Sequence, residues 1–281
     1  MVNNKEYRIA VFENSQRLVE SNQKVKDSLK RSIEKQGFYI SGEYEVTELA
    51  RKFEKTNIYI TMNSTMDAGR SWSKKGNTAV LNFASATNPG GGVVGGSSAQ
   101  EECLCRVSTL FNCLNDQKCW DRFYNPNRAD GNVLHNDNII YTPKVIVFKD
   151  DKYNLLQNNE FAFVDVITCA APNLREKPNN GWCNVGESTK SIKISDDELK
   201  KLHIKRANAI LEVAAIHNIK NLVLGAFGCG AFRNKPDVVA AAYKEVMDKL
   251  NGVFENVEFA IYCENGIASE NYLAFRNEFK T

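Results

Sequence analysis

The fold is decided by the stretch Leu81-Asn-Phe-Ala-Ser-Ala-Thr-Asn-Pro-Gly-Gly-Gly-Val-Val-Gly-Gly-Ser-Ser-Ala-Gln-Glu-Glu102. A β-branched and aromatic run over 78–83 predicts a buried strand, and the pattern over 99–114 predicts a helix. The loop between them contains five glycines. Glycines at a strand-to-helix turn let a ligand approach the backbone, and the N–H groups and dipole of the helix favour an anion. The stretch therefore predicts an α/β unit with a phosphate site.

A second stretch, residues 221–236, has the same order of strand, glycine loop and helix. A predicted strand over 221–224 is followed by three more glycines, and a helix is predicted to start near Pro236, a residue suited to a first helical turn. Two such loops in one sheet indicate a ligand with a pyrophosphate at its middle. Cys229 lies between two of these glycines with no His nearby, so we interpret it as a small turn residue rather than a nucleophile.

Two common nucleotide-binding motifs do not fit these loops. Neither loop contains the Gly-Lys-Ser/Thr of a P-loop ATPase. Neither contains a Gly-x-Gly-x-x-Gly that opens a helix and is followed by an acidic residue at the end of a next strand, so a Rossmann dinucleotide site is poorly supported.

Outward from the two loops, strand and helix patterns alternate. This order is typical of a mixed central sheet with helices on both faces, a three-layer α/β/α fold. The remaining predicted strands are 57–62, 139–142, 145–148, 161–169 and 257–263, and the remaining predicted helices are 14–37, 196–217, 236–250 and 268–279. We expect residues 1–50 to form an N-terminal helical extension on a catalytic domain that spans 51–281.

Composition excludes several classes of protein. The net charge of the 281 residues is only +2, which argues against a dedicated duplex-DNA binder, so direct nucleic-acid binding is not expected. No run approaches the roughly 20 apolar residues of a membrane span. The 8 cysteines include no Cys-x-x-Cys pair, and the 3 histidines are not spaced as metal ligands. We expect a cytoplasmic monomer with reduced thiols, no metal and no cofactor.

The two glutamates at the start of the predicted helix each have a structural alternative. Ser98 and Glu101 fit a capping box, in which Glu101 would bond back to the Ser98 backbone, and this role is as well supported as a catalytic one. Glu102 lies four residues before Arg106 and could form an ordinary ion pair. However, Glu102 also lies in the first turn beside the glycine loop, so we favour a functional role for it.

Taken together, the two loops resemble the macrodomain family, and more closely the microbial type of poly(ADP-ribose) glycohydrolase. The family's signature is a Gly-Gly-Gly run followed after a short spacer by Gln-Glu-Glu. Here it is Gly90-Gly91-Gly92, seven residues, then Gln100-Glu101-Glu102. Asn82-Phe-Ala-Ser-Ala, Asn88-Pro, 164–173 and 225–232 are also similar, and the resemblance spans roughly residues 55–280.

The resemblance implies a macrodomain with ADP-ribose bound across the carboxyl ends of its strands. It implies that Glu102 is the catalytic carboxyl and that Glu101 helps to hold the ribose at the scissile bond. It further implies a set of ADP-ribose-binding residues on the two loops: Asn88, Gly90, Gly91, Gly92, Val93, Val94, Gln100, Gly228, Cys229, Gly230, Ala231 and Phe232. Tyr262 and Phe275 are candidate neighbours of the adenine.

The expected function is hydrolysis of the ribose–ribose O-glycosidic bond of poly(ADP-ribose), with Glu102 as general acid and base. The partners would be ADP-ribose or poly(ADP-ribose) on modified proteins. Three alternatives remain open: a hydrolase for a single ADP-ribose on protein or nucleic acid, a macrodomain that binds ADP-ribose without cleaving it, and a nucleotide-binding scaffold with a structural role. An intact Gln-Glu-Glu argues against pure binding, because binding does not need the acid.

Overall fold

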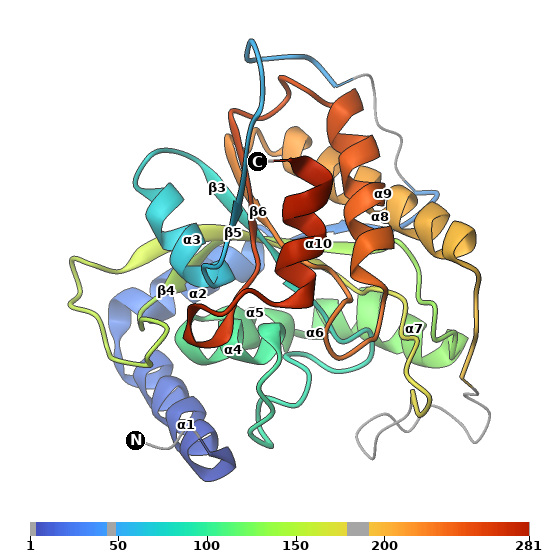
Figure 1. The fold of residues 1–281 in the computed structure, drawn as a ribbon. Coiled ribbons are helices and arrows are strands. Elements are labelled where there is room, and N and C mark those ends of the chain that lie inside the picture. Colours follow the sequence, from blue (N-terminus) through green and yellow to red (C-terminus); the bar gives the residue numbers. More distant parts are fainter. Residues whose placement is uncertain (1–3, 44–48, 179–190, 281) are drawn as a thin grey trace.

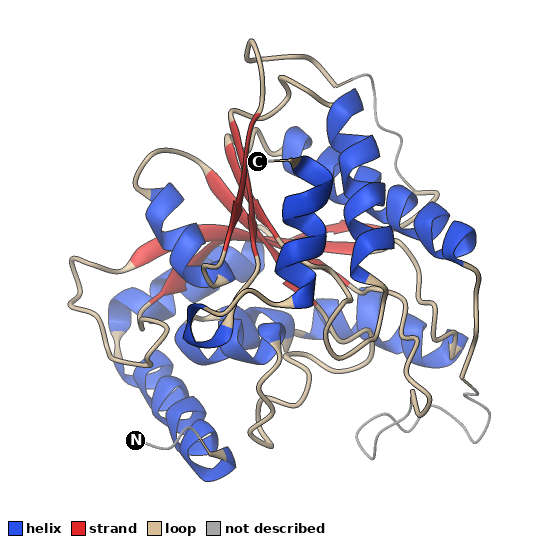
Figure 2. Cartoon of the chain, viewed as in Figure 1, coloured by secondary structure: helices blue, strands red, loops and turns tan. Residues whose placement is uncertain are grey.

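A computed structural model describes residues 4–43, 49–178 and 191–280 of the chain. Its centre is a seven-stranded sheet with the order β1-β4-β5-β3-β6-β7-β2, flanked by helices on both faces (Figures 1 and 2). Five neighbouring strands, from β5 to β2, run parallel, and β4 and β1 are antiparallel to their neighbours. The strands are β1 (Gly37–Tyr39), β2 (Asn57–Thr61), β3 (Thr78–Phe83), β4 (Ile139–Val147), β5 (Ala162–Cys169), β6 (Asn221–Leu224) and β7 (Asn256–Ala260).

Helices cover both faces of the sheet. One face carries α8 (Asp196–Ile216), α9 (Pro236–Lys249) and α10 (Glu270–Phe279), on the right in Figure 1. The other face carries α2 (Gln23–Glu34), which packs on β4, and α3 (Thr65–Ser73), α4 (Gln100–Val107) and α5 (Leu110–Leu114), with α1 (Lys5–Ser21) against α2 and α4. Short turns α6 (Gln117–Cys119), η1 (Trp120–Tyr124) and α7 (Asn125–Asp130) follow α5. The predicted three-layer α/β/α fold with a mixed sheet is confirmed.

Side chains along β3 alternate between the hydrophobic cores on the two faces of the sheet. Ala79 and Leu81 face the core beneath α8 and α9, whereas Val80 faces the core beneath α3 and α4. Asn82 follows on the α4 side, fully buried. The strand therefore directs one polar side chain at the start of α4, and the loop that follows β3 begins at the carboxyl edge of the sheet.

Two of the predicted helices are interrupted. The helix predicted over 14–37 is instead two helices that meet at Asn22, whose side chain accepts from the backbone N–H of Val25 at 3.2 Å and so caps α2. The helix predicted over 99–114 breaks at Ser108, which adopts an extended conformation and bridges to Val147. At each break a partner outside the helix replaces hydrogen bonds that a continuous helix would make itself: the Asn22 side chain at one and the bridge to Val147 at the other.

The remaining differences between the predicted and the observed elements concern β4, α3 and β1. The two predicted strands over 139–148 form one strand, β4, with a register shift between Thr142 and Val145. Helix α3 was not predicted, although Ser64 caps it by accepting from the Asp67 N–H. Residues 1–50 are not purely helical, because β1 pairs with β4 and completes the sheet. In the described part of the chain, no helix is long and apolar enough to span a membrane.

Candidate active site

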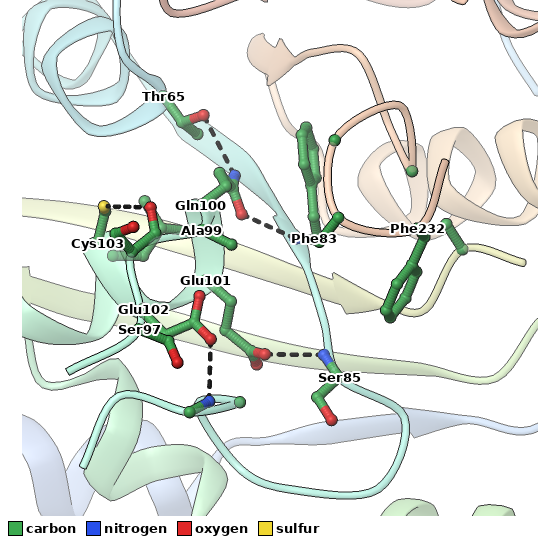
Figure 3. Close-up of a pocket in the computed structure, with 18 of the residues that line it drawn as sticks. Thr65, Phe83, Ser85, Ser97, Ala99, Gln100, Glu101, Glu102, Cys103 and Phe232 are labelled. Carbon is green, nitrogen blue, oxygen red and sulfur yellow. Dashed lines mark hydrogen bonds between the residues drawn. The ribbon is translucent and has the colours of Figure 1, made fainter. Parts of the chain in front are cut away.

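The parallel strands place the two glycine loops at one edge of the sheet, as expected for an open α/β fold. A cavity of about 1380 Å³ lies there. The loop after β3, the first turn of α4 and the loop after β6 all line it, and α1 contributes Arg8. Figure 3 shows Glu101 and Glu102 between Cys103 on one side and Phe232 on the other. The cavity is larger than the roughly 300–1,000 Å³ of ordinary small-molecule sites, so it has room for an extended nucleotide.

Glu101 is 3% exposed and fixed by hydrogen bonds to the end of β3. Its Oε2 accepts from the Ser85 N–H at 2.7 Å, and its Oε1 accepts from Asn82 Nδ2 at 3.2 Å. Burial, followed by the charge of Glu102, raises the pKa of Glu101 to about 8. The capping box considered as the alternative role of Glu101 is not formed: α4 begins one residue later than that box requires, after Ala99, and the carboxyl points to β3 instead of back to Ser98.

Glu102 is 7% exposed and also lines the cavity. Its Oε1 accepts from the Gly92 N–H at 2.9 Å, whereas its Oε2 is buried without a hydrogen-bond partner in the described structure. The alternative ion pair with Arg106 is not formed, because the Arg106 guanidinium donates to the carbonyls of Ser97 and Arg8. Glu102 is therefore held through one oxygen only, next to the space where a ligand would lie.

The two carboxyls converge on Gly91. This glycine has a φ of +57°, and a Cβ at its position would stand 2.6 Å from Glu102 Oε1 and 3.2 Å from Glu101 Oε2. Although adjacent helical side chains diverge by about 100°, both reach the same loop, because the loop folds back over the first turn of α4. The glycine run thus makes room for the carboxyls as well as for a ligand.

The side-chain amide of Gln100 is occupied by hydrogen bonds within the protein. Its Oε1 accepts from the Phe83 N–H at 2.9 Å, and its Nε2 donates to the Leu81 carbonyl at 2.7 Å and to Thr65 Oγ1 at 3.2 Å (Figure 3). Both amide protons are therefore used within the protein. Gln100 lines the cavity, but its side chain ties α4 to the edge of β3 and fixes the direction in which the two glutamates point.

The other predicted binding residues fall into two groups. Those that line the cavity are Asn88, Gly91, Gly92, Gly228, Gly230, Ala231 and Phe232. Gly90, Val93, Val94 and Cys229 do not line it. The side chain of Val93 is fully buried in the core beneath α4, and Val94 is 58% exposed, so a contact from either would have to come from the backbone or from outside the cavity. Burial raises the pKa of the Cys229 thiol, in keeping with a residue that is not a nucleophile.

The second loop is held by Asn234, a residue that the sequence analysis did not single out. Its Nδ2 donates to the carbonyls of Pro172, Gly228 and Phe232 at 2.7, 3.1 and 3.2 Å. Its Oδ1 bonds the Nε2 of His203 at 2.8 Å, and burial lowers the pKa of His203 to about 4, so the imidazole is neutral. The sequence signal that could have identified Asn234 is an Asn directly after a glycine loop, because the short amide side chain can donate to several carbonyls of a turn.

The two residues predicted as neighbours of the adenine lie in different environments. Tyr262 lines the cavity and is 67% exposed, so it is available to a base. Phe275 is fully buried among the helices behind β7 and does not line the cavity, so its prediction as an adenine neighbour is wrong. Among the described residues, all seven cysteines are free and no cluster of His, Cys, Asp and Glu could hold a metal; Cys183 lies outside the described residues.

The buried carboxyl of Glu101 makes stability depend on pH. Its pKa in the folded protein lies above the unfolded value, so the folded state retains a proton that the unfolded state loses. The free energy of unfolding is expected to fall between about pH 4.5 and 8, by a few kcal/mol at most. In denaturation series from pH 5 to 8, Glu101→Gln should remove part of this fall, and the exposed control Glu13→Gln should not. Equal slopes for wild type and Glu101→Gln would contradict this prediction.

Removing the Asn234 amide should loosen the second loop. Asn234→Ala takes one donor from each of the three carbonyls, but those of Gly228 and Phe232 still accept from backbone N–H groups, and only that of Pro172 is left without a donor among the described residues. The change is expected to cost about 1–3 kcal/mol of unfolding free energy and to weaken ADP-ribose binding. Chemical denaturation and calorimetric titration measure the two effects. The exposed Asn125→Ala should change neither. An Asn234→Ala variant as stable as wild type would show that other contacts hold the loop.

The geometry is that of an α/β protein with two glycine loops and a pair of buried carboxyls around one cavity, and comparison with known proteins agrees. Residues 7–150 match the family model "Microbial-type PARG, catalytic domain". The poly(ADP-ribose) glycohydrolase of Thermomonospora curvata bound to the inhibitor ADP-HPD is 29% identical, with a TM-score of 0.80 over 98% of this chain and 100% of that one. The Deinococcus radiodurans enzyme in complex with ADP-ribose is 32% identical, with a TM-score of 0.74 over 90% of this chain and 96% of that one.

This chain therefore belongs to the microbial-type poly(ADP-ribose) glycohydrolase family. The family model begins in α1, so the N-terminal helices lie within the family's catalytic domain, upstream of the span over which the sequence motifs carried the resemblance. A comparison with curated proteins found no match.

Proposed function

We propose that this protein hydrolyses the ribose–ribose O-glycosidic bond of poly(ADP-ribose) and releases ADP-ribose, with Glu102 as general acid and base. The observation that carries the proposal is the pair of buried carboxyls that lines a cavity between two glycine loops. A protein that only binds ADP-ribose gains nothing from burying a second carboxyl there, because burial of a like-charged pair costs free energy.

The assignment of the proton follows from the hydrogen bonds. Burial, followed by the charge of Glu102, raises the pKa of Glu101, so a proton is held in the site near neutral pH. Both oxygens of Glu101 already accept from fixed N–H donors, so Glu101 is less available than Glu102 to reach a ligand. Glu102 Oε2 accepts no hydrogen bond in the described structure, and we propose that the proton leaves the carboxyl pair through this oxygen.

The reaction then proceeds in two proton transfers. Glu102 gives its proton to the departing ribose oxygen as the bond to the anomeric carbon breaks, through an oxocarbenium-like transition state. The resulting carboxylate takes a proton from water, whose oxygen attacks the anomeric carbon. N–H groups of the two loops would hold the diphosphate, whose negative charge stabilises the positive ribose ring.

The test is incubation of the purified protein with automodified poly(ADP-ribose) and, in parallel, with a protein that carries single ADP-ribose groups. Release of free ADP-ribose from the polymer supports the proposal. Release from the singly modified protein alone would identify a mono-ADP-ribosyl hydrolase. Binding of ADP-ribose with no release from either substrate would identify a reader.

A further inference from the structure

Helix α1 lies against the outer side of the first glycine loop. A Cβ at Gly96 would stand only 2.7 Å from the Lys5 carbonyl, and Gly96 has a φ of +75°. Close approach of the loop to the helix therefore requires glycine at this position. Arg8, one turn further along α1, donates from Nε to the Gly96 carbonyl at 2.7 Å and lines the cavity.

The same helix is anchored to the body of the domain by buried polar groups. Ser15 Oγ donates to the carbonyl of Arg106 at 2.6 Å, and Lys149 Nζ donates to Ser15 Oγ at 2.7 Å. Arg106 closes the connection, because its guanidinium donates to the Arg8 carbonyl at 3.3 Å and to the Ser97 carbonyl. Helix α1, α4 and residues 96–97 are thus joined by buried and partly buried hydrogen bonds.

The contact continues from residues 96–97 to the catalytic carboxyl. The Ser97 N–H donates to the Gly92 carbonyl at 3.1 Å, which closes the loop on itself. The Gly92 N–H in turn donates to Glu102 Oε1 at 2.9 Å. Among the described residues, the Gly92 N–H is the one donor to the Glu102 carboxyl, so its position depends on the point where Arg8 holds the loop.

We propose that Arg8 on α1 is a positioning residue for the reaction, which holds the loop of residues 92–97 so that the Gly92 N–H orients Glu102. This inference rests on the proposed function, because it concerns the same carboxyl. Arg8 acts through Gly96 and Gly92 and transfers no proton itself. The residue lies outside the glycine and glutamate signature, and the family motif gives it no role.

The primary test measures kcat and KM on poly(ADP-ribose) for wild type, Arg8→Ala and the control Arg17→Ala, which removes an exposed arginine from the same helix. Because a small misplacement of a catalytic group is costly, Arg8→Ala is expected to lower kcat by about 10- to 100-fold. Its KM should change less, and Arg17→Ala should match wild type. Arg8→Lys keeps the charge without the guanidinium Nε–H donor and is expected to recover only part of the rate.

Two further variants separate positioning from a loss of folding. Gly96→Ala should reproduce the loss of kcat by a different route, because its Cβ would push the loop away from the Lys5 carbonyl. In a Glu102→Gln background, Arg8→Ala should have little further effect on the residual rate, since both changes act on one carboxyl. Amide exchange at residues 92–97 should be faster in Arg8→Ala while the melting temperature stays within a few degrees of wild type.

The outcomes are distinguishable from those of the proposed function. If wild type releases no ADP-ribose, the proposed function fails, and amide exchange at residues 92–97 still decides whether Arg8 holds the loop. If wild type is active, an unchanged kcat in Arg8→Ala, full recovery in Arg8→Lys, or additive losses in the double variant would overturn the positioning role.

Discussion

Glu102→Gln is expected to lower the release of ADP-ribose from poly(ADP-ribose) by about 10²- to 10⁴-fold, the usual contribution of a general acid or base. The glutamine keeps the size of the side chain, and its Oε1 can still accept from the Gly92 N–H. It has no proton to give to the departing ribose oxygen and cannot take one from water. The rate of ADP-ribose release measures the loss, and calorimetric titration should show that the affinity for ADP-ribose stays within a few-fold of wild type.

Glu101→Gln provides the matched comparison for this prediction. The raised pKa belongs to Glu101, whose oxygens are occupied by the N–H donors of Asn82 and Ser85. We expect a smaller loss of rate for Glu101→Gln, because a glutamine can keep only part of these contacts and the acid remains. A larger loss for Glu101→Gln than for Glu102→Gln would move the acid–base role to Glu101.

The sequence predicts the location of the site well because the chemistry is local. Each glycine loop follows its strand and precedes its helix within one stretch of chain, so the strand-loop-helix order could be inferred without knowledge of the fold. Parallel strands then require both loops to reach the same edge of the sheet. The order of the seven strands could not be inferred in this way, because it depends on pairings such as that of β3 with β6, which lie far apart in the sequence.

The roles of individual side chains were less predictable, because they depend on what lies across the loop. Ser98 and Glu101 have the spacing of a capping box, but Asn82 and the Ser85 N–H compete for the carboxyl and prevail. Gln100 belongs to the signature and lines the cavity, but its amide is engaged by β3 and Thr65. In both cases tertiary packing determines the hydrogen-bond partners of the side chain, and the spacing of residues in the sequence does not show them.

The contacts of the N-terminal region could not be predicted from local sequence either. The predicted helix over 14–37 carried no motif, and nothing in its pattern indicates that the earlier residues Lys5 and Arg8 touch a glycine loop nearly 90 positions away. The break at Asn22 could have been found, since Asn is a strong helix cap. The contact with Gly96 could not, because it depends on how α1 packs across α4.

Gly91→Ala is expected to abolish most of the activity, at least about 10²-fold, because a 1 Å displacement of catalytic groups can cost that much. Its backbone has a φ of +57°, which disfavours any side chain, and the new methyl would stand 2.6 Å from Glu102 Oε1. Glu102 or the loop must shift to relieve the contact. The kcat of ADP-ribose release measures the effect on catalysis, and the melting temperature measures the cost of the strained backbone.

Gly42→Ala is the control that separates steric contact from backbone strain. Gly42 also has a positive φ, +86°, but a Cβ there would meet nothing within 4 Å. We expect Gly42→Ala to lose on the order of 1 kcal/mol of stability and to keep wild-type activity. If Gly91→Ala were as active as Gly42→Ala, the carboxyl of Glu102 would tolerate displacement, and the close fit between the glycine run and the glutamate pair would have no catalytic purpose.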